Sequence, residues 1–272
     1  MIKDFFQYEF LQNAFWASLL SAIICGVIGV IISQKKLFMM AGGIAHTSYG
    51  GVGLGFLLGI EPMITATAFS VISALIIGRV RKKGGRNSDI IIALLWSLGM
   101  ALGVVFTSLL KGYPPDINAY LFGNILAVKK SDILIMALFC LIILIAFFML
   151  YNYIISFLFD ETFALVSGIN PVFFENLILI LIALSIILLI RVVGIILVMA
   201  LLSAPSATAS LICKNIKGQI ILSSVFSFAF CLIVLLISYN FAVSSGAVIV
   251  FVAVISYLIS LLLNKIINRK NR

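Results

Sequence analysis

Long apolar runs fill the chain from end to end, and short polar or proline-containing breaks separate them. A helix rises 1.5 Å per residue and needs ~20 mostly apolar residues to cross the hydrocarbon layer of a bilayer. We therefore predict an all-α, polytopic membrane protein in which residues 1–272 form one transmembrane domain. Nine runs qualify as spans, or eight if the first lies at the membrane surface: residues 13–33, 39–60, 63–80, 89–110, 131–151, 173–191, 193–213, 219–239 and 245–264.

Basic residues at the breaks orient these predicted spans. If Lys35 and Lys36 are cytoplasmic and the spans alternate, all but five of the 18 lysines and arginines fall on the cytoplasmic side. Cytoplasmic loops of membrane proteins are enriched in these residues, so the pattern predicts an N-terminus outside the cytoplasm. The exceptions are Lys3, Lys111, Lys129, Lys130 and Arg191.

The composition agrees with lipid as the solvent, because 64% of the residues are hydrophobic and only 10% are charged. Soluble domains have about 45–50% and about 25%. The net charge of +9 gathers at span ends rather than on one soluble surface, so we expect the lipid bilayer and not nucleic acid as a partner. The four cysteines form no C-x-x-C pair and are interpreted as small hydrophobic residues.

Within the second run, residues 39–60, the segment 40–60 differs from the other runs in its glycines. Five small residues recur every four positions, which gives one face of a helix almost no side-chain bulk. Such a face allows the backbone of a neighbouring helix to approach closely. We predict close helix packing along Gly43, Thr47, Gly51, Gly55 and Gly59.

The same run holds His46, the single histidine of the chain. It lies ten residues beyond Lys36, about 15 Å along a helix and therefore near the bilayer midplane. A polar ring at that depth is costly and indicates a functional site, here a path for a proton or a metal ion. The alternative is a histidine hydrogen-bonded to a neighbouring helix.

One imidazole cannot form a tight metal site, because transition metals take several ligands. A loose site suits transport, since the ion must leave again. The candidates to complete it are Ser48, Tyr49, Asp116, Asn124 and a second His46 across a two-fold dimer.

The predicted cytoplasmic break FDETFALVSGINP, residues 159–171, forms a second feature of interest. Asp160 and Glu161 open a short helical turn, which suits the helix dipole, and Gly168 closes it. A short cytoplasmic helix between spans is a place where a soluble partner could act on the membrane part. An ordinary capped turn is the alternative.

Motifs of common enzymes are missing from the sequence. It contains no G-x-S-x-G elbow, no H-E-x-x-H pair and no Walker phosphate loop. We therefore expect no catalytic residues and no ATP site in this chain.

Six segments, taken in order, are distributed over nearly the whole chain. They read GGIAHTSYGGVGLGFLLGI (42–60), ALLWSLGMALGVVF (93–106), AYLFGNILAV (119–128), FDETFALVSGINP (159–171), VGIILVMALLSAPSATA (193–209) and SSGAVIV (244–250). In this order they resemble the permease subunits of bacterial ABC importers for zinc, manganese or iron, often called the ABC-3 family.

The resemblance implies an ABC type II importer-like permease bundle in the bacterial cytoplasmic membrane. It implies a transported divalent metal ion, no permanently bound cofactor, and ATP on two separate ABC ATPase subunits. An extracytoplasmic metal-binding protein and a second permease chain, in a homodimer, would complete the assembly. At the residue level it implies that His46 lines the path, and that the ATPase contact of the coupling element 159–171 includes Asp160, Glu161, Ala164 and Gly168.

Two positions depart from the family pattern. The family usually has an aspartate four residues before the histidine and another after the Phe-Gly pair, where this chain has Gly42 and Asn124. Two carboxylates that would attract a divalent cation are thus replaced, which leaves the transported ion open. The alternatives from other classes are a proton-coupled secondary transporter that uses His46 as a relay, and a structural membrane scaffold.

Overall fold

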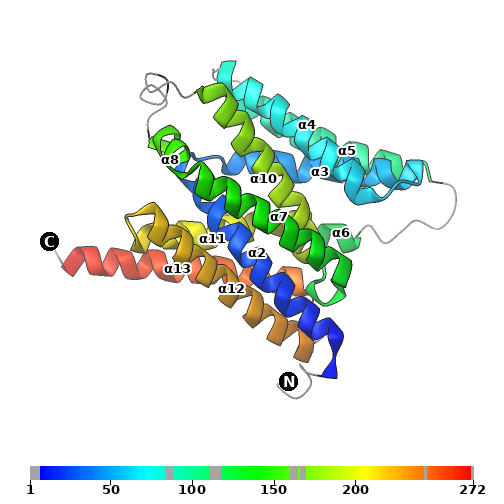
Figure 1. Ribbon diagram of the computed structural model, residues 1–272. Coiled ribbons are helices and arrows are strands. Elements are labelled where there is room, and N and C mark those ends of the chain that lie inside the picture. Colours follow the sequence, from blue (N-terminus) through cyan, green and yellow to red (C-terminus); the bar gives the residue numbers. More distant parts are fainter. Residues whose placement is uncertain are drawn as a thin grey trace.

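The computed structural model describes residues 7–83, 88–110, 118–159, 165, 170–241 and 244–270 (Figure 1). Within these residues every regular element is a helix. The helices are α2 (Glu9–Gln34), α3 (Phe38–Leu58), α4 (Pro62–Lys83), α5 (Ser88–Ser108), α6 (Asn118–Phe122), the 3₁₀ helix η1 (Ile125–Ala127), α7 (Lys130–Met149), α8 (Tyr151–Phe159), α10 (Pro171–Val193), α11 (Ile195–Ile212), α12 (Ile216–Phe241) and α13 (Ser245–Lys270).

The predicted all-α membrane fold is confirmed. Seven of the described helices are long and apolar enough to cross a bilayer, namely α2, α4, α5, α7, α10, α12 and α13. Helices α3 and α11 occupy the two remaining predicted ranges. Helix α3 is not among the seven, and it carries the glycines and the polar residues around His46.

The helices form two groups joined by α10. In the first group α3 packs between α4 and α5, and in the second α2 packs against α11 and α12, with α13 beside α11. Helix α10 contacts α3 and α4 on one side and α2 and α11 on the other (Figure 1). The bundle is therefore organised around a central helix that touches both groups.

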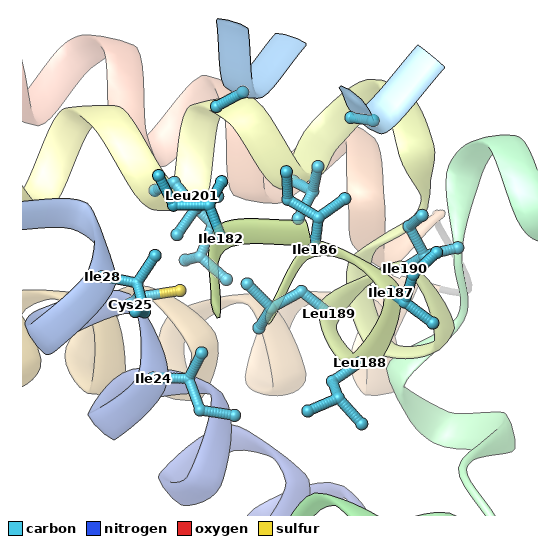
Figure 2. Close-up of a cluster of buried hydrophobic side chains, with 14 of the residues drawn as sticks. Ile24, Cys25, Ile28, Ile182, Ile186, Ile187, Leu188, Leu189, Ile190 and Leu201 are labelled. Atoms are coloured by element: carbon cyan, nitrogen blue, oxygen red, sulfur yellow. The ribbon is translucent and has the colours of Figure 1, made fainter. Parts of the chain in front are cut away.

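Aliphatic side chains fill the centre of the bundle. Figure 2 shows Ile24 and Ile28 of α2 beside Ile182 and Ile186 of α10, with Leu201 of α11 closing the cluster. All five are at most 1% exposed, so each removes its full apolar area from the surroundings. By contrast, α5 and α13 bury little of their length within this chain, and their apolar faces point outward.

The ion pairs gather at two ends of the bundle, on the sides that the basic residues predict. At the predicted cytoplasmic end, Arg81 pairs with Glu175 at 4.0 Å and donates to the backbone carbonyl of Lys35 at 3.5 Å. At the opposite end, the Nζ of Lys130 lies 3.1 Å from the Oε1 of Glu9. The described contacts thus bring together groups that the sequence places on the same side of the membrane.

Candidate translocation path

Helix α3 is held in place by glycine contacts with α4. A Cβ atom on Gly51 would lie 2.6 Å from the Cα of Ala66, and one on Gly55 would lie 2.7 Å from the Cα of Pro62. Those distances are too short for any side chain, so the two backbones touch. A Cβ on Gly43 would meet the side chains of two isoleucines at 3.1 Å. Gly59 differs, because it ends α3 in a left-handed conformation with φ 68°, and a Cβ added to it would meet no atom within 4 Å.

A second glycine face of α3 meets α5. A Cβ on Gly53 would lie 2.6 Å from the carbonyl oxygen of Gly103, and one on Gly50 would lie 3.0 Å from that of Gly99. Sequence reasoning missed Gly99 and Gly103, although their four-residue spacing in α5 is the same signal that singled out α3. Close backbone contacts with α4 and α5 thus hold α3 on two sides. These contacts fix the direction in which the His46 side chain leaves the helix.

The imidazole of His46 is buried, with 9% of the residue exposed. It stacks on the indole of Trp96 from α5, with ring centroids 4.2 Å apart and planes inclined by 18°. Its Nδ1 is buried and has no hydrogen-bond partner among the described residues. At this atom, the described residues do not supply the hydrogen bond to a neighbouring helix that would make His46 a purely structural residue.

Position 42 lies one turn before His46 and is covered by two side chains. A Cβ on Gly42 would lie 3.2 Å from the Cζ3 of Trp96 and 3.6 Å from the Cε of Met199 in α11. The space beside the imidazole is therefore apolar where the family resemblance would place a carboxylate.

Ser48 and Tyr49 take different positions around α3. Ser48 is fully buried and donates to the carbonyl of Ala45 at 2.5 Å, so its hydroxyl is used within its own helix. It lies about 200° around the helix from His46. Tyr49 is 5% exposed, and its ring packs where α5 has Gly103.

Asn124 lies on the connection between α6 and η1. Its Oδ1 accepts a hydrogen bond from the backbone N–H of Leu126 at 3.0 Å and so caps η1. The side chain is exposed. Asp116, the other candidate in this region, lies outside the described residues.

Glycines allow the backbone of residues 119–128, the predicted outer segment, to contact the backbone at the start of α11. Gly123 and Gly194 have positive φ of 62° and 90°, and a Cβ on Gly194 would lie 2.5 Å from the carbonyl oxygen of Leu121. Gly246 closes against the same backbone, where its Cβ would collide with the carbonyl oxygen of Phe122. Three segments that carry the family resemblance therefore meet through glycines, which the sequence alone did not relate to one another.

Tyr120 of α6 places this outer segment above the end of α3. Its ring meets Phe56 edge-on with centroids 5.7 Å apart. Burial raises the pKa of the Tyr120 phenol, and the nearby Arg191 guanidinium opposes that rise. The phenol is therefore neutral at physiological pH.

Arg191, at the predicted outer end of α10, joins two carboxylates. Its guanidinium pairs with Asp132 at the start of α7 and, at 2.5 Å, with Glu61 just before α4. These groups form one end of a cavity of about 440 Å³ whose remaining lining is mainly apolar side chains of α4, α7 and α10. Sequence reasoning placed Arg191 at the outer end of its span but did not find its partners.

The predicted coupling residues Asp160, Glu161, Ala164 and Gly168 lie outside the described residues. The structure does place the two flanks of their segment. Asn170 caps α10 by accepting from the N–H of Val172 at 3.0 Å. Beside it, a hollow of about 310 Å³ is lined by Arg81, Lys82, Pro171, Val172 and Glu175.

Among the described residues, no group of three or more His, Cys, Asp and Glu side chains could hold a metal ion. The described part of one chain therefore offers single donors for a passing ion rather than a closed site. Among the described histidine, aspartate and glutamate side chains, His46 lies nearest the centre of its predicted span.

Comparisons with known proteins relate nearly the whole chain to one family. The family model described as "ABC 3 transport family" matches residues 7–264. An uncharacterized membrane protein of Synechocystis sp. is 40% identical over 255 residues, which cover 94% of this chain and 91% of that protein. The manganese transport system membrane protein MntC of Listeria monocytogenes is 33% identical over 261 residues, covering 96% and 93%. The structure of PsaBC from Streptococcus pneumoniae in complex with Fab superposes with a TM-score of 0.85 at 33% identity, covering 96% of this chain and 95% of that chain.

Proposed function

The chain belongs to the ABC 3 transport family, and from this premise we propose that it is the membrane-spanning subunit of an ATP-driven importer. Its cargo is a divalent metal ion, and its direction is into the bacterial cytoplasm. Hydrolysis takes place on two separate ATPase subunits, because this sequence contains no phosphate-binding loop of its own. Membership of this family leaves the proton-coupled alternative without support.

Manganese is the first candidate for the cargo. Relatives at 33% and 32% identity over 96% of the chain are named as manganese transport permeases. Zinc and iron are the other two candidates. Replacement of the expected carboxylates by Gly42 and Asn124 removes oxygen ligands that manganese prefers, so the ion must be identified by competition.

The observation that carries the proposal within the structure is the state of His46. A buried imidazole with an unpartnered Nδ1 stands on a helix that two glycine faces hold in place. Neutral imidazole is a ligand for divalent transition metals, and a site with few ligands releases its ion readily. We assign His46 to the translocation path, with Tyr49, Ser48, Asn124 and Asp116 as weaker candidates.

The partners follow from the family and from the exposed faces. Helices α5 and α13 leave apolar faces outward, which suits lipid and a second permease chain. A second copy would add a second His46 to the path. The ATPases would contact segment 159–171 through Asp160, Glu161, Ala164 and Gly168, and an extracytoplasmic metal-binding protein would deliver the ion at the opposite end.

Uptake by His46 variants tests this role. In sealed vesicles that contain the permease and its ATPase, and to which the metal-binding protein is supplied, His46→Ala should lower ATP-dependent uptake of radioactive manganese by at least about tenfold, because the path loses its histidine ligand. Thr47→Ala, which removes the neighbouring hydroxyl, is the matched control and should leave uptake within about twofold. Excess zinc or iron in the same assay identifies the preferred ion. Unchanged uptake by His46→Ala would contradict a role in transport and would leave His46 with a packing role alone.

A further inference from the structure

The stack between His46 and Trp96 is an arrangement that the proposed function does not itself explain. The chain contains one histidine and two tryptophans, and it brings two of these three rings face to face near the middle of α3. At 4.2 Å between centroids and 18° between planes, the indole fixes the plane of the imidazole. Such aromatic pairs are attractive beyond the area they bury.

The indole is held by its own helix. Gly99 follows Trp96 by about one turn of α5, and a Cβ on Gly99 would lie 3.1 Å from the carbonyl oxygen of His46. The two backbones are therefore in contact directly beside the stack. Helix α5 cannot rotate or slide to carry the indole away without separating from α3.

The rim of the indole and the end of the Met199 side chain from α11 both lie over Gly42 of α3. The indole Cζ3 lies 3.2 Å, and the Cε of Met199 lies 3.6 Å, from the place where a Cβ of Gly42 would stand. A side chain at position 42 would press on the rim of the indole, so the glycine leaves the indole room in this position. Gly42 and Trp96 are thus a coupled pair, although 54 positions separate them.

In a neutral imidazole the lone pair of one nitrogen and the N–H of the other both lie in the ring plane, so stacking on the ring face leaves both nitrogens available. Nδ1 of His46 is buried and has no hydrogen-bond partner among the described residues. Metal-binding histidines usually have their ring orientation fixed by a hydrogen bond from the second nitrogen. Here the indole face fixes the ring plane, since the Nδ1 of His46 has no hydrogen-bond partner among the described residues.

We propose that Trp96 is a positioning residue for the cargo ion, which sets the plane of the His46 imidazole and depends on Gly42 for its seat. The inference rests on the proposed role of His46 in import. It adds that capture of a divalent cation depends on the direction of the imidazole edge, and that this direction is set from α5.

Fluorescence tests the stack without reference to transport. Trp16→Phe leaves Trp96 as the single indole of the full-length chain, which is placed in lipid nanodiscs. Because the imidazole lies on the indole, His46→Ala in this background should shift or brighten the emission. Manganese chloride should change the emission saturably when His46 is present and only linearly, by collision, when it is absent. Emission that is indifferent to His46→Ala overturns the stack and with it this inference.

Uptake kinetics test the positioning role. Trp96→Phe keeps an aromatic face and should retain uptake within about threefold, whereas Trp96→Leu should raise the KM for manganese or lower uptake by about tenfold or more, since small misplacements of a binding group are costly. Trp16→Leu, on an exposed part of α2, is the matched control and should behave like the parent protein. Equal uptake by Trp96→Phe and Trp96→Leu, whether both high or both low, overturns the proposal.

Gly42→Ala provides a second variant in case Trp96→Leu does not insert. The added methyl group should displace the indole, change the emission of Trp96 and raise the KM in the same direction as Trp96→Leu. An unchanged spectrum and KM contradict the coupling. If His46→Ala leaves uptake intact while it alters Trp96 emission, the proposed function of His46 fails and the stack itself stands.

Discussion

At the scale of single residues, Arg191 shows how a membrane bundle treats charge. Its guanidinium pairs with Asp132, which is 7% exposed, and with the much more exposed Glu61. Removing one partner of a buried pair leaves an uncompensated charge, which costs more than the pair gained when it formed. The pair therefore ties the outer ends of α7 and α10 together, while the surface contact with Glu61 adds little.

Arg191→Met should destabilise the protein by about 3 kcal/mol, because Asp132 then remains buried and unpaired. Thermal unfolding in detergent measures this loss. Glu61→Gln is the matched control and should change stability by less than about 1 kcal/mol. The double variant Arg191→Met with Asp132→Asn should recover most of the loss, and a failure to recover would mean that Arg191 acts by packing alone.

At the scale of helices, close backbone contact rather than side-chain interlocking holds α3. Lipid tails are as apolar as the helices, so association in a membrane depends on van der Waals packing of small residues. The glycines of α3 face α4 at Gly51 and Gly55 and face α5 at Gly50 and Gly53. A helix built this way is rigidly placed, which suits a helix that carries the path histidine.

Substitutions at two glycines of α3 distinguish the cost of a lost backbone contact from the cost of an unfavourable backbone conformation. Gly51→Ala would place a methyl group 2.6 Å from the α4 backbone and should destabilise the protein by about 1–3 kcal/mol. Gly59→Ala has open space around it, so only its left-handed φ of 68° opposes the change, at about 1 kcal/mol. Measured in the same detergent, the melting temperature should fall further for Gly51→Ala than for Gly59→Ala. A larger fall for Gly59→Ala would show that α3 and α4 are not in backbone contact.

At the scale of the whole molecule, the ion pairs and the predicted sides of the membrane agree. Arg81, Glu175 and Lys35 meet at one end, and Glu61, Asp132 and Arg191 meet at the other. One end of α10 takes part in each group, through Glu175 and Arg191, so this central helix connects the predicted cytoplasmic flank of segment 159–171 with the ion pairs at the predicted outer end. A displacement of one end of α10 would therefore be transmitted along the helix to its other end.

Cysteine labelling tests this orientation. In a Cys213→Ser background, where the other native cysteines are buried, a cysteine at position 130 should react with a membrane-impermeant maleimide in intact cells. Cysteines at positions 36 and 214 should react only after permeabilisation, since they lie on the predicted cytoplasmic side. Labelling at all three positions in intact cells would invert or break the topology.

Much of the fold was accessible from the sequence, since length and hydropathy suffice to find membrane helices. The glycine spacing also indicated which helix packs closely. The partners of Arg191 were not accessible, because they stand 59 and 130 residues away and depend on how three helices dock. The contact of Trp96 with His46 depends on the rotation of α5 about its axis, which hydropathy does not determine.

The most direct measurement for the central claim is co-purification of the tagged chain from its native membrane, followed by an ATPase assay of the complex. The account predicts that a separate ATPase accompanies the chain. Its turnover should rise when an extracytoplasmic binding protein loaded with manganese, and to a smaller degree zinc or iron, is added. Two results would contradict the proposal that the chain is part of an importer. One is purification of the chain with no ATPase, and the other is co-purification with an ATPase whose turnover does not rise when the metal-loaded binding protein is added.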